Sequence, residues 1–421
     1  MRNDAAPPRR AWLWVSAAYL FQSIPAAVRD EALPVALKNG GYGDASITTA
    51  VSLLGLIFGF KILLAPLVAV FRPLGFILSA EVMISGLLGA LAFQVGSDQP
   101  SSTQIIVLLV ILSFVAAAHD FALDGYFVAS LDDRTRATHS GLLNFASKLG
   151  LVLAGPGLVW LAGRIMEFGP QVADAWAWAL ASAAVLALMA AFFNYLGLRR
   201  EAAVESDAHT LPERYAEMRR GLLALAQDVR VPAVLGLIFF YRASEIHMAR
   251  ILPLFATDSI HGGLALDNKT YAIMRIATAV AGLALGGIVG SQVVARLGLA
   301  RSLVPLGIAM HAPLIAVAWL AGTDHHSSAQ ICTVFFIEYL AYGAGLCALL
   351  LAMMKVASGP GAGVRYAALS TCALLANYLP GLWAGHLAEK LGYAQYFLFA
   401  LLLAIPGIGA AIFARKQFAH G

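Results

Sequence analysis

The chain has 421 residues, of which 60% are hydrophobic and only 12% are charged, and its formal net charge is +4. A soluble domain normally carries about 25% charged residues. This composition therefore excludes a soluble enzyme or a nucleic-acid-binding protein and indicates an all-α protein of the lipid bilayer. Cys332, Cys347 and Cys372 lie within apolar runs and show neither a disulfide pattern nor a metal-ligand spacing.

Apolar runs of about 20 residues recur along the whole chain, and each is long enough to cross a bilayer as a helix. If these runs cross the membrane one after another, 18 of the 28 Lys and Arg residues fall on the side of the amino terminus and 4 on the opposite side. Because cytoplasmic loops are enriched in Lys and Arg, both termini are predicted to be cytoplasmic. We predict twelve transmembrane helices, at about 11–37, 45–70, 74–96, 104–130, 141–167, 173–198, 231–258, 270–295, 300–322, 328–355, 364–388 and 393–414.

The longest hydrophilic segment divides the membrane region into halves of similar length. In this segment Thr210 to Glu213 form a capping box, followed by leucines alternating with arginines, which predicts an amphipathic helix at the inner membrane surface. Two six-helix halves with both termini inside are the plan of the major facilitator fold. The expected parts are a tail (1–10), a six-helix bundle (11–198), a cytoplasmic linker (199–230), a second six-helix bundle (231–414) and a tail (415–421).

The stretch from Phe114 to Gly125 places His119, Asp120 and Asp124 near the middle of an otherwise apolar helix. Charged groups in the hydrocarbon layer cost at least about 2.5 kcal/mol each and normally face a water-filled path. Asp120 and Asp124 are four residues apart, so they share one helical face, where each carboxylate raises the proton affinity of the other. This predicts a proton-coupled site. The structural alternative is that each acid pairs with a base on a neighbouring helix, as Asp120 could with Lys148.

The second half also carries ionisable residues within its expected spans, and Arg242 and Glu245, three apart on one face, are expected to pair. Basic and acidic groups are nearly balanced, which suits an anionic solute held by cations whose partner acids take up protons. The candidates for proton coupling are Asp120, Asp124, Glu245 and Glu338, and those for substrate binding are Lys61, His119, Lys148 and Arg242.

Two helix-breaking pairs stand at matching points of the halves, Pro156-Gly157 and Pro380-Gly381, and are candidate hinges. No phosphate-binding loop, HExxH or positioned nucleophilic serine is present, so neither a primary pump nor an intramembrane hydrolase is expected. We expect a protein that is not an enzyme and has no catalytic residue, metal site or cofactor, with the proton as coupling ion.

Five segments resemble the AmpG-like, peptide/acetyl-CoA transporter branch of the major facilitator superfamily: HDFALDGYF (119–127), FKILLAPL (60–67), FYRASE (240–245), FIEYLAYGAG (336–345) and RYAALS (365–370). The resemblance implies that Asp120 and Asp124 are the important acids. It also places Lys148, Arg242 and Glu245 where the family has an arginine, a lysine and an aspartate. The chain departs from the family pattern at four places. His119 replaces a usual glutamine, Ala69 stands where the family has an acid, and Glu81 occupies a position that is usually polar and uncharged. Of the family's basic cluster after the second span, only Arg72 is present.

The branch contains anhydro-muropeptide permeases of cell-wall recycling and siderophore permeases of the FptX/RhtX type. We therefore expect a monomeric, multi-pass permease of the bacterial inner membrane, whose partners are the lipid bilayer and a bulky, anionic small molecule or glycopeptide. The departures, together with a chain that carries no extra spans, favour a siderophore, imported with protons. The alternatives are a muropeptide permease, an exporter, or a sensor that binds its ligand without moving it.

Overall fold

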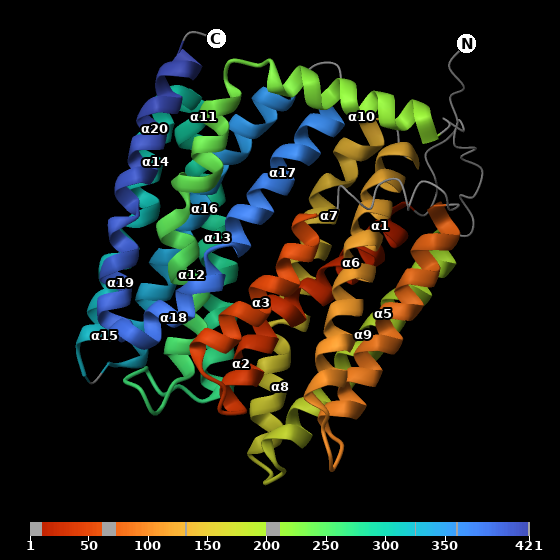
Figure 1. Cartoon of the computed structure of the whole chain (residues 1–421), viewed down its shortest axis with the longest axis vertical. Coiled ribbons are helices and arrows are strands. Elements are labelled where there is room, and N and C mark those ends of the chain that lie inside the picture. The colour runs from red at the N-terminus through yellow and green to blue at the C-terminus, as the bar shows by residue number, and fades with distance from the viewer. Residues whose placement is uncertain are drawn as a thin grey trace. The chain divides into compact units, whose positions relative to one another are not determined.

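The computed structural model describes residues 11–60, 73–130, 133–198, 211–324, 326–358 and 361–419. Every regular element in these ranges is a helix, which confirms the all-α class (Figure 1). Within them, eight helices are long and apolar enough to span a membrane, or nine if 218–226 and 231–257, which meet at 91°, form one span. The count of twelve spans stays a prediction.

The chain divides into two compact units. The first contains residues up to 36 and from 60 to 214, and the second contains 37–59 and 215–421. The segment 37–59, expected in the first bundle, thus packs with the second unit through α3 (Asp44–Gly59). The reason is a close contact with α18 (Gly381–Leu391), where a side chain at Gly385 would collide with the backbone of Asp44.

In the first unit, α1 packs on α7, and α5 packs on both α6 and α9. Its core includes Trp14 of α1 and Tyr126 of α6, whose rings meet edge to face with centroids 5.4 Å apart. The elements are α1 (Ala11–Ala27), the π-helix η1 (Val28–Ala32), α2 (Leu33–Asn39), which continues into the second unit, α5 (Pro73–Val95), α6 (Ser102–Ser130), α7 (Asp133–Ala154), α8 (Pro156–Met166) and α9 (Val172–Leu198).

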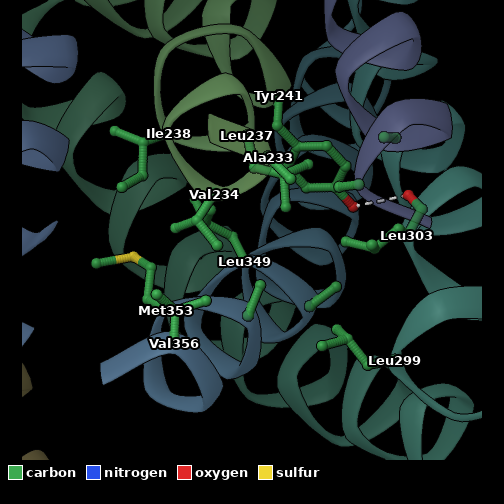
Figure 2. Packing of buried hydrophobic residues seen from close by; sticks show 14 of the residues in the cluster. Ala233, Val234, Leu237, Ile238, Tyr241, Leu299, Leu303, Leu349, Met353 and Val356 are labelled. Atoms are coloured by element: carbon green, nitrogen blue, oxygen red, sulfur yellow. Dashed lines mark hydrogen bonds between the residues drawn. The ribbon is translucent and has the colours of Figure 1, made fainter. Parts of the chain in front are cut away.

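In the second unit, the core surrounds a π-helix, η3 (Leu237–Tyr241). Figure 2 shows Tyr241 reaching α14, where its hydroxyl donates a 3.1 Å hydrogen bond to the carbonyl oxygen of Leu303. The other elements are α3, α10 (Leu211–Ala226), of which the part from Tyr215 belongs to this unit, α11 (Val231–Gly236), α12 (Ala243–Thr257), α13 (Asn268–Leu297), α14 (Leu299–His311), α15 (Pro313–Gly322), α16 (Ser328–Ala357), α17 (Ala362–Tyr378), α18, α19 (Tyr393–Leu402) and α20 (Ala404–Ala419).

The tightest helix pair of the second unit is α13 with α16. A side chain at Gly282, Gly286 or Gly290 of α13 would meet the chain of α16, at the last two positions its backbone. Glycines four apart let two membrane helices approach closely, which supplies the van der Waals contact that replaces the hydrophobic drive in lipid. This contact holds α16, which carries Glu338, against α13.

The structure places a helix in the expected linker and breaks at the two expected proline-glycine pairs. The predicted linker helix is present as α10, although Thr210 of its capping box lies outside the described residues. The helices also break at both proline-glycine pairs: α7 ends at Ala154 before Pro156, and α17 ends at Tyr378 before Gly381. A hinge at either break stays a prediction.

Candidate functional site

Two of the four acids predicted for proton coupling, Asp120 and Asp124, lie one helical turn apart on α6 of the first unit and receive hydrogen bonds from α1. The amide of Gln22 donates to Asp120 Oδ1, and the hydroxyl of Tyr19 donates to Asp124 Oδ1 at 3.3 Å. Tyr19 and Gln22 are three residues apart, so one face of α1 serves one face of α6. Asp120 is half-buried and Asp124 is exposed.

His119, the residue before this pair, is turned into the interior of the first unit. It is 1% exposed, and its Nε2 lies 3.3 Å from Oε1 of Glu81 on α5, which is 0% exposed. The amide of Asn194, on α9, donates to the same oxygen at 2.6 Å. The side chain of His119 therefore contacts Glu81 rather than Asp120 or Asp124.

The two lysines of the first half that were predicted to bind substrate are Lys61 and Lys148. Lys148 lies on α7 with an exposed side chain and makes no ion pair with Asp120, so the predicted pair is not formed. The reason is that α1 packs against both α6 and α7, and Gln22 of α1 donates to Asp120. Lys61 lies outside the described residues.

In the second unit, Arg242 stands at a break in the helix, between η3 and α12, with φ −108° and ψ 4°. Its guanidinium pairs with Glu245 Oε2 at 2.9 Å, as the sequence predicted. The same guanidinium lies 5.0 Å from the ring centroid of Tyr342 on α16. Glu338, also on α16, is close enough to interact electrostatically with Arg242. The structure thus brings together three of the predicted residues of this half.

Two further arginines of the second unit repeat the stacking of a cation on a tyrosine ring. Arg250 lies 4.6 Å from the ring centroid of Tyr378, and Arg275 lies 5.0 Å from that of Tyr339. A guanidinium over an aromatic ring gains about 0.5–2 kcal/mol. Arg250 also donates from Nε and Nη2 to the carbonyl oxygen of Asn377. These contacts hold two more cations of the second unit in fixed positions.

Among the described residues there are two π-helices: η1 follows α1 in the first half, and η3 follows α11, the first helix after the linker, in the second half. Each is next to ionisable residues: η1 contains Arg29 and Asp30, which pair at 2.8 Å, and η3 precedes Arg242. π-Bulges are rare and concentrate at functional sites. The equivalent sequence position of the two breaks supports a functional role for these charged residues.

A buried ion cluster of the second unit joins α2, α3, α12 and α19. Lys38 Nζ lies 2.7 Å from Asp44 Oδ1 and 2.6 Å from Asp258 Oδ2. The hydroxyl of Tyr393 lies 2.8 Å from Asp44 Oδ2 and 2.7 Å from Asp258 Oδ2. Burial would raise the pKa of Asp258, but the hydrogen bonds from Lys38 and Tyr393 outweigh it and lower that pKa.

Several relatives of the chain are named as transporters or permeases. No protein-family model matches it. A putative transporter, AmpG 4 of Rickettsia conorii, is 24% identical over 405 residues, which cover 92% of each chain. The anhydromuropeptide permease of Escherichia coli K12 is 22% identical over 409 residues, which cover 92% of this chain and 78% of that one. The chain resembles the AmpG transporters.

Solved structures confirm the major facilitator fold. A bacterial homologue of the human lysosomal transporter Spinster superposes with a TM-score of 0.73 at 15% identity, covering 99% of this chain and 98% of the other. A D-xylose-proton symporter superposes with a TM-score of 0.69 at 13% identity, covering 96% of each chain. These identities show the fold alone. The AmpG resemblance inferred from short segments extends over nearly the whole chain, because the alignments with the two AmpG-type relatives each cover 92% of it.

Sequence reasoning missed the neutral partners of the acids. Tyr19, Gln22 and Asn194 carry no charge at neutral pH, so charged residues within apolar runs do not point to them. Gln22 and Asn194 carried a usable signal, since an amide within an apolar run requires a hydrogen-bonding partner once it is buried.

Proposed function

We propose that the chain is a proton-coupled secondary transporter of the AmpG type that imports an anhydromuropeptide across the bacterial inner membrane. One observation carries the coupling: Asp120 and Asp124 lie one turn apart on α6, and both accept hydrogen bonds from α1. Two carboxylates on one helical face favour uptake of a proton by one of them. Loss of that proton would change the contacts between α1 and α6.

The relatives favour the muropeptide over the siderophore that the sequence led us to prefer. The Escherichia coli relative is named an anhydromuropeptide permease and aligns over 92% of this chain. The departures that had favoured a siderophore include His119 and Glu81, which contact each other in the interior of the first unit. They are two parts of one buried contact, so they say little about which solute is bound.

The second unit would supply binding of the anionic solute in this proposal. Arg242 is held at a helix break by Glu245 and Tyr342. A guanidinium fixed in this way loses little rotamer entropy when it meets a carboxylate of the solute. We assign Arg242 to solute binding and Glu245 to holding it in place. The twelve spans and the cytoplasmic termini complete the proposal.

The test is uptake by right-side-out vesicles of a labelled anhydromuropeptide and, separately, of a labelled ferric siderophore, with and without an imposed proton gradient. We expect gradient-dependent accumulation of the muropeptide only. Asp120→Asn and Asp124→Asn, which keep side-chain volume, should bind the solute but reduce accumulation to that of vesicles without the protein. The matched control is Asp98→Asn, at an exposed acid between α5 and α6.

Each alternative has its own outcome in this experiment. Accumulation of the siderophore would replace the proposed solute, and binding without accumulation by the unaltered protein would indicate a sensor. Solute movement only out of the vesicles would indicate an exporter. If both Asp→Asn variants accumulate muropeptide as well as Asp98→Asn does, proton coupling at these acids is wrong.

A further inference from the structure

Three helices of the first unit enclose an acid that the proposed coupling pair does not include. Glu81 of α5, His119 of α6 and Asn194 of α9 are 0%, 1% and 0% exposed. All three functional groups meet at one atom, because Oε1 of Glu81 accepts from Asn194 Nδ2 at 2.6 Å and lies 3.3 Å from His119 Nε2. Each of these contacts joins a different pair of helices.

The other oxygen atoms of this cluster are left without donors. Among the described residues, neither Oε2 of Glu81 nor Oδ1 of Asn194 has a hydrogen-bond partner, and both atoms are buried. A buried polar atom without a partner costs about 1–3 kcal/mol, and more when the group is charged. Both orphaned atoms are acceptors when Glu81 is ionised. The cluster therefore lacks a hydrogen-bond donor rather than an acceptor.

One proton on Glu81 supplies that hydrogen atom. A carboxylic acid and a primary amide that already share an N–H···O bond are complementary for a second O–H···O bond, from the acid to the amide oxygen. Protonation also removes the charge from a group with no exposed surface, which avoids the cost of a desolvated carboxylate. We propose that Glu81 is a buried proton-binding site, held as a neutral acid by Asn194, which exchanges its proton through His119.

The surroundings of Glu81 are consistent with this assignment. The helices that pack on α5 are α6 and α9, which contribute the titratable His119 and the uncharged Asn194. Of the described residues, His119 is the one charged or titratable group that acts electrostatically on Glu81. Among the residues that the structure describes, no Lys or Arg forms an ion pair with Glu81, whereas Glu245 pairs with Arg242.

Proton exchange needs only water as the final acceptor. Rotation of the Glu81 carboxyl group brings its protonated oxygen to the position of Oε1, beside His119 Nε2. The proton then passes to Nε2, which gives a carboxylate and an imidazolium, and the imidazolium releases its Nδ1 proton to water. The two forms differ in charge separation, so they differ in how tightly α5 and α6 attract each other. His119 directly precedes Asp120, so the exchange occurs on the helix that carries the proposed coupling pair. Only the assignment of this proton to coupling rests on the proposed function.

The site can be tested without transport, by infrared spectroscopy of the purified protein at neutral pH. A protonated carboxylic acid has a carbonyl stretching band that carboxylates lack. We expect this band to be lost in Glu81→Gln and retained in the matched control Glu167→Gln, an exposed acid after α8. In Asn194→Leu the band should move to higher wavenumber because the carbonyl loses its hydrogen bond. An unchanged band in Glu81→Gln would overturn the proposal.

A shorter acid keeps the test decisive if the glutamine variant does not fold. Glu81→Asp should then retain a carbonyl band at a different position, and an unchanged spectrum would overturn the proposal. In vesicles, Glu81→Gln mimics the protonated acid permanently. It should exchange solute across the membrane but lose gradient-driven accumulation, while Glu167→Gln retains both.

The outcomes separate the two proposals. If Glu81→Gln loses the band yet accumulates solute like Glu167→Gln, the site binds a proton that is not coupled to transport, and the coupling part of this inference is wrong. If the unaltered protein shows no gradient-driven uptake, the proposed function fails, and the infrared band alone decides whether Glu81 binds a proton.

Discussion

The buried carboxylates of the two units face different kinds of partner. In the first unit, Glu81 meets an imidazole and an amide. In the second unit, Asp258 meets the ammonium group of Lys38, and Glu245 meets the guanidinium of Arg242. A carboxylate beside a permanent cation stays ionised, whereas one beside neutral groups can take up a proton. Glu245, which the sequence suggested for proton coupling, is therefore better suited to holding Arg242.

The largest effect is expected when the cation is removed from the buried cluster of Lys38, Asp44 and Asp258. Lys38→Met leaves the buried acids Asp44 and Asp258 without their shared ammonium group. Loss of one partner of a buried pair costs about 3–5 kcal/mol. We expect a large fall in the thermal unfolding temperature in detergent micelles, with little change for the exposed control Lys390→Met. Equal temperatures for the two variants would contradict the importance of this pairing.

The pH dependence of the same variant gives a second test. In the unaltered protein the lowered pKa of Asp258 stabilises the fold above the unfolded pKa, and this stabilisation is lost as the pH falls through the folded pKa. Hydrogen bonds from Lys38 to Asp258 and Asp44 outweigh the effect of burial and raise the pKa of Lys38. The stabilisation by Lys38 is therefore lost only as the pH rises through that raised pKa. Lys38→Met should behave oppositely at acidic pH and gain stability on acidification, because folding then takes up a proton.

A smaller effect is expected when the cation paired with Glu245 is removed, because Glu245 then resembles Glu81, which has no such partner among the described residues. Arg242→Met removes the guanidinium that lies 2.9 Å from this buried acid. The lost charge-assisted hydrogen bond costs about 2 kcal/mol. We expect Glu245 to take up a proton at neutral pH and to add an acid carbonyl band in the infrared spectrum. The double variant Arg242→Met/Glu245→Gln should lack the added band, and a spectrum unchanged by Arg242→Met would contradict the comparison.

Between α10 and α11, Asp228 provides a milder case of an acid held by cations. It pairs with Arg230 at 2.8 Å and with Arg365 of α17 at 3.1 Å. The hydrogen bonds from Arg230 lower the pKa of Asp228 despite the opposing effect of partial burial. Asp228→Asn should therefore cost about 1 kcal/mol near neutral pH.

The difference between Asp228→Asn and the unaltered protein should disappear in acid. The stabilisation by Asp228 is present above its unfolded pKa and is lost as the pH falls through the folded value. Unfolding temperatures measured across this range check the sign. A difference that grows in acid would show that Asp228 is not held ionised by its two arginines.

Helix positions followed from hydrophobic run length, but side-chain partners did not. The break before Pro156 was predictable because proline cannot continue a helix. The Arg242 to Glu245 pair was also predictable, since both residues lie on one turn. In contrast, Glu81 and Asn194 are 113 residues apart in the chain. Their contact depends on α9 packing against α5, which the periodicity of either helix alone does not specify.

The smallest predicted effect concerns the neutral donors of the first unit. Tyr19→Phe removes the hydroxyl that donates to Asp124 at 3.3 Å and leaves the ring in place. The loss of one such bond changes stability by about 1 kcal/mol. The proton affinity of Asp124 should rise, because the lost bond stabilised its ionised form. Gradient-driven uptake should then persist to higher external pH than in the control Tyr42→Phe, on an exposed tyrosine. If both variants share one pH profile, Tyr19 positions α1 without tuning Asp124.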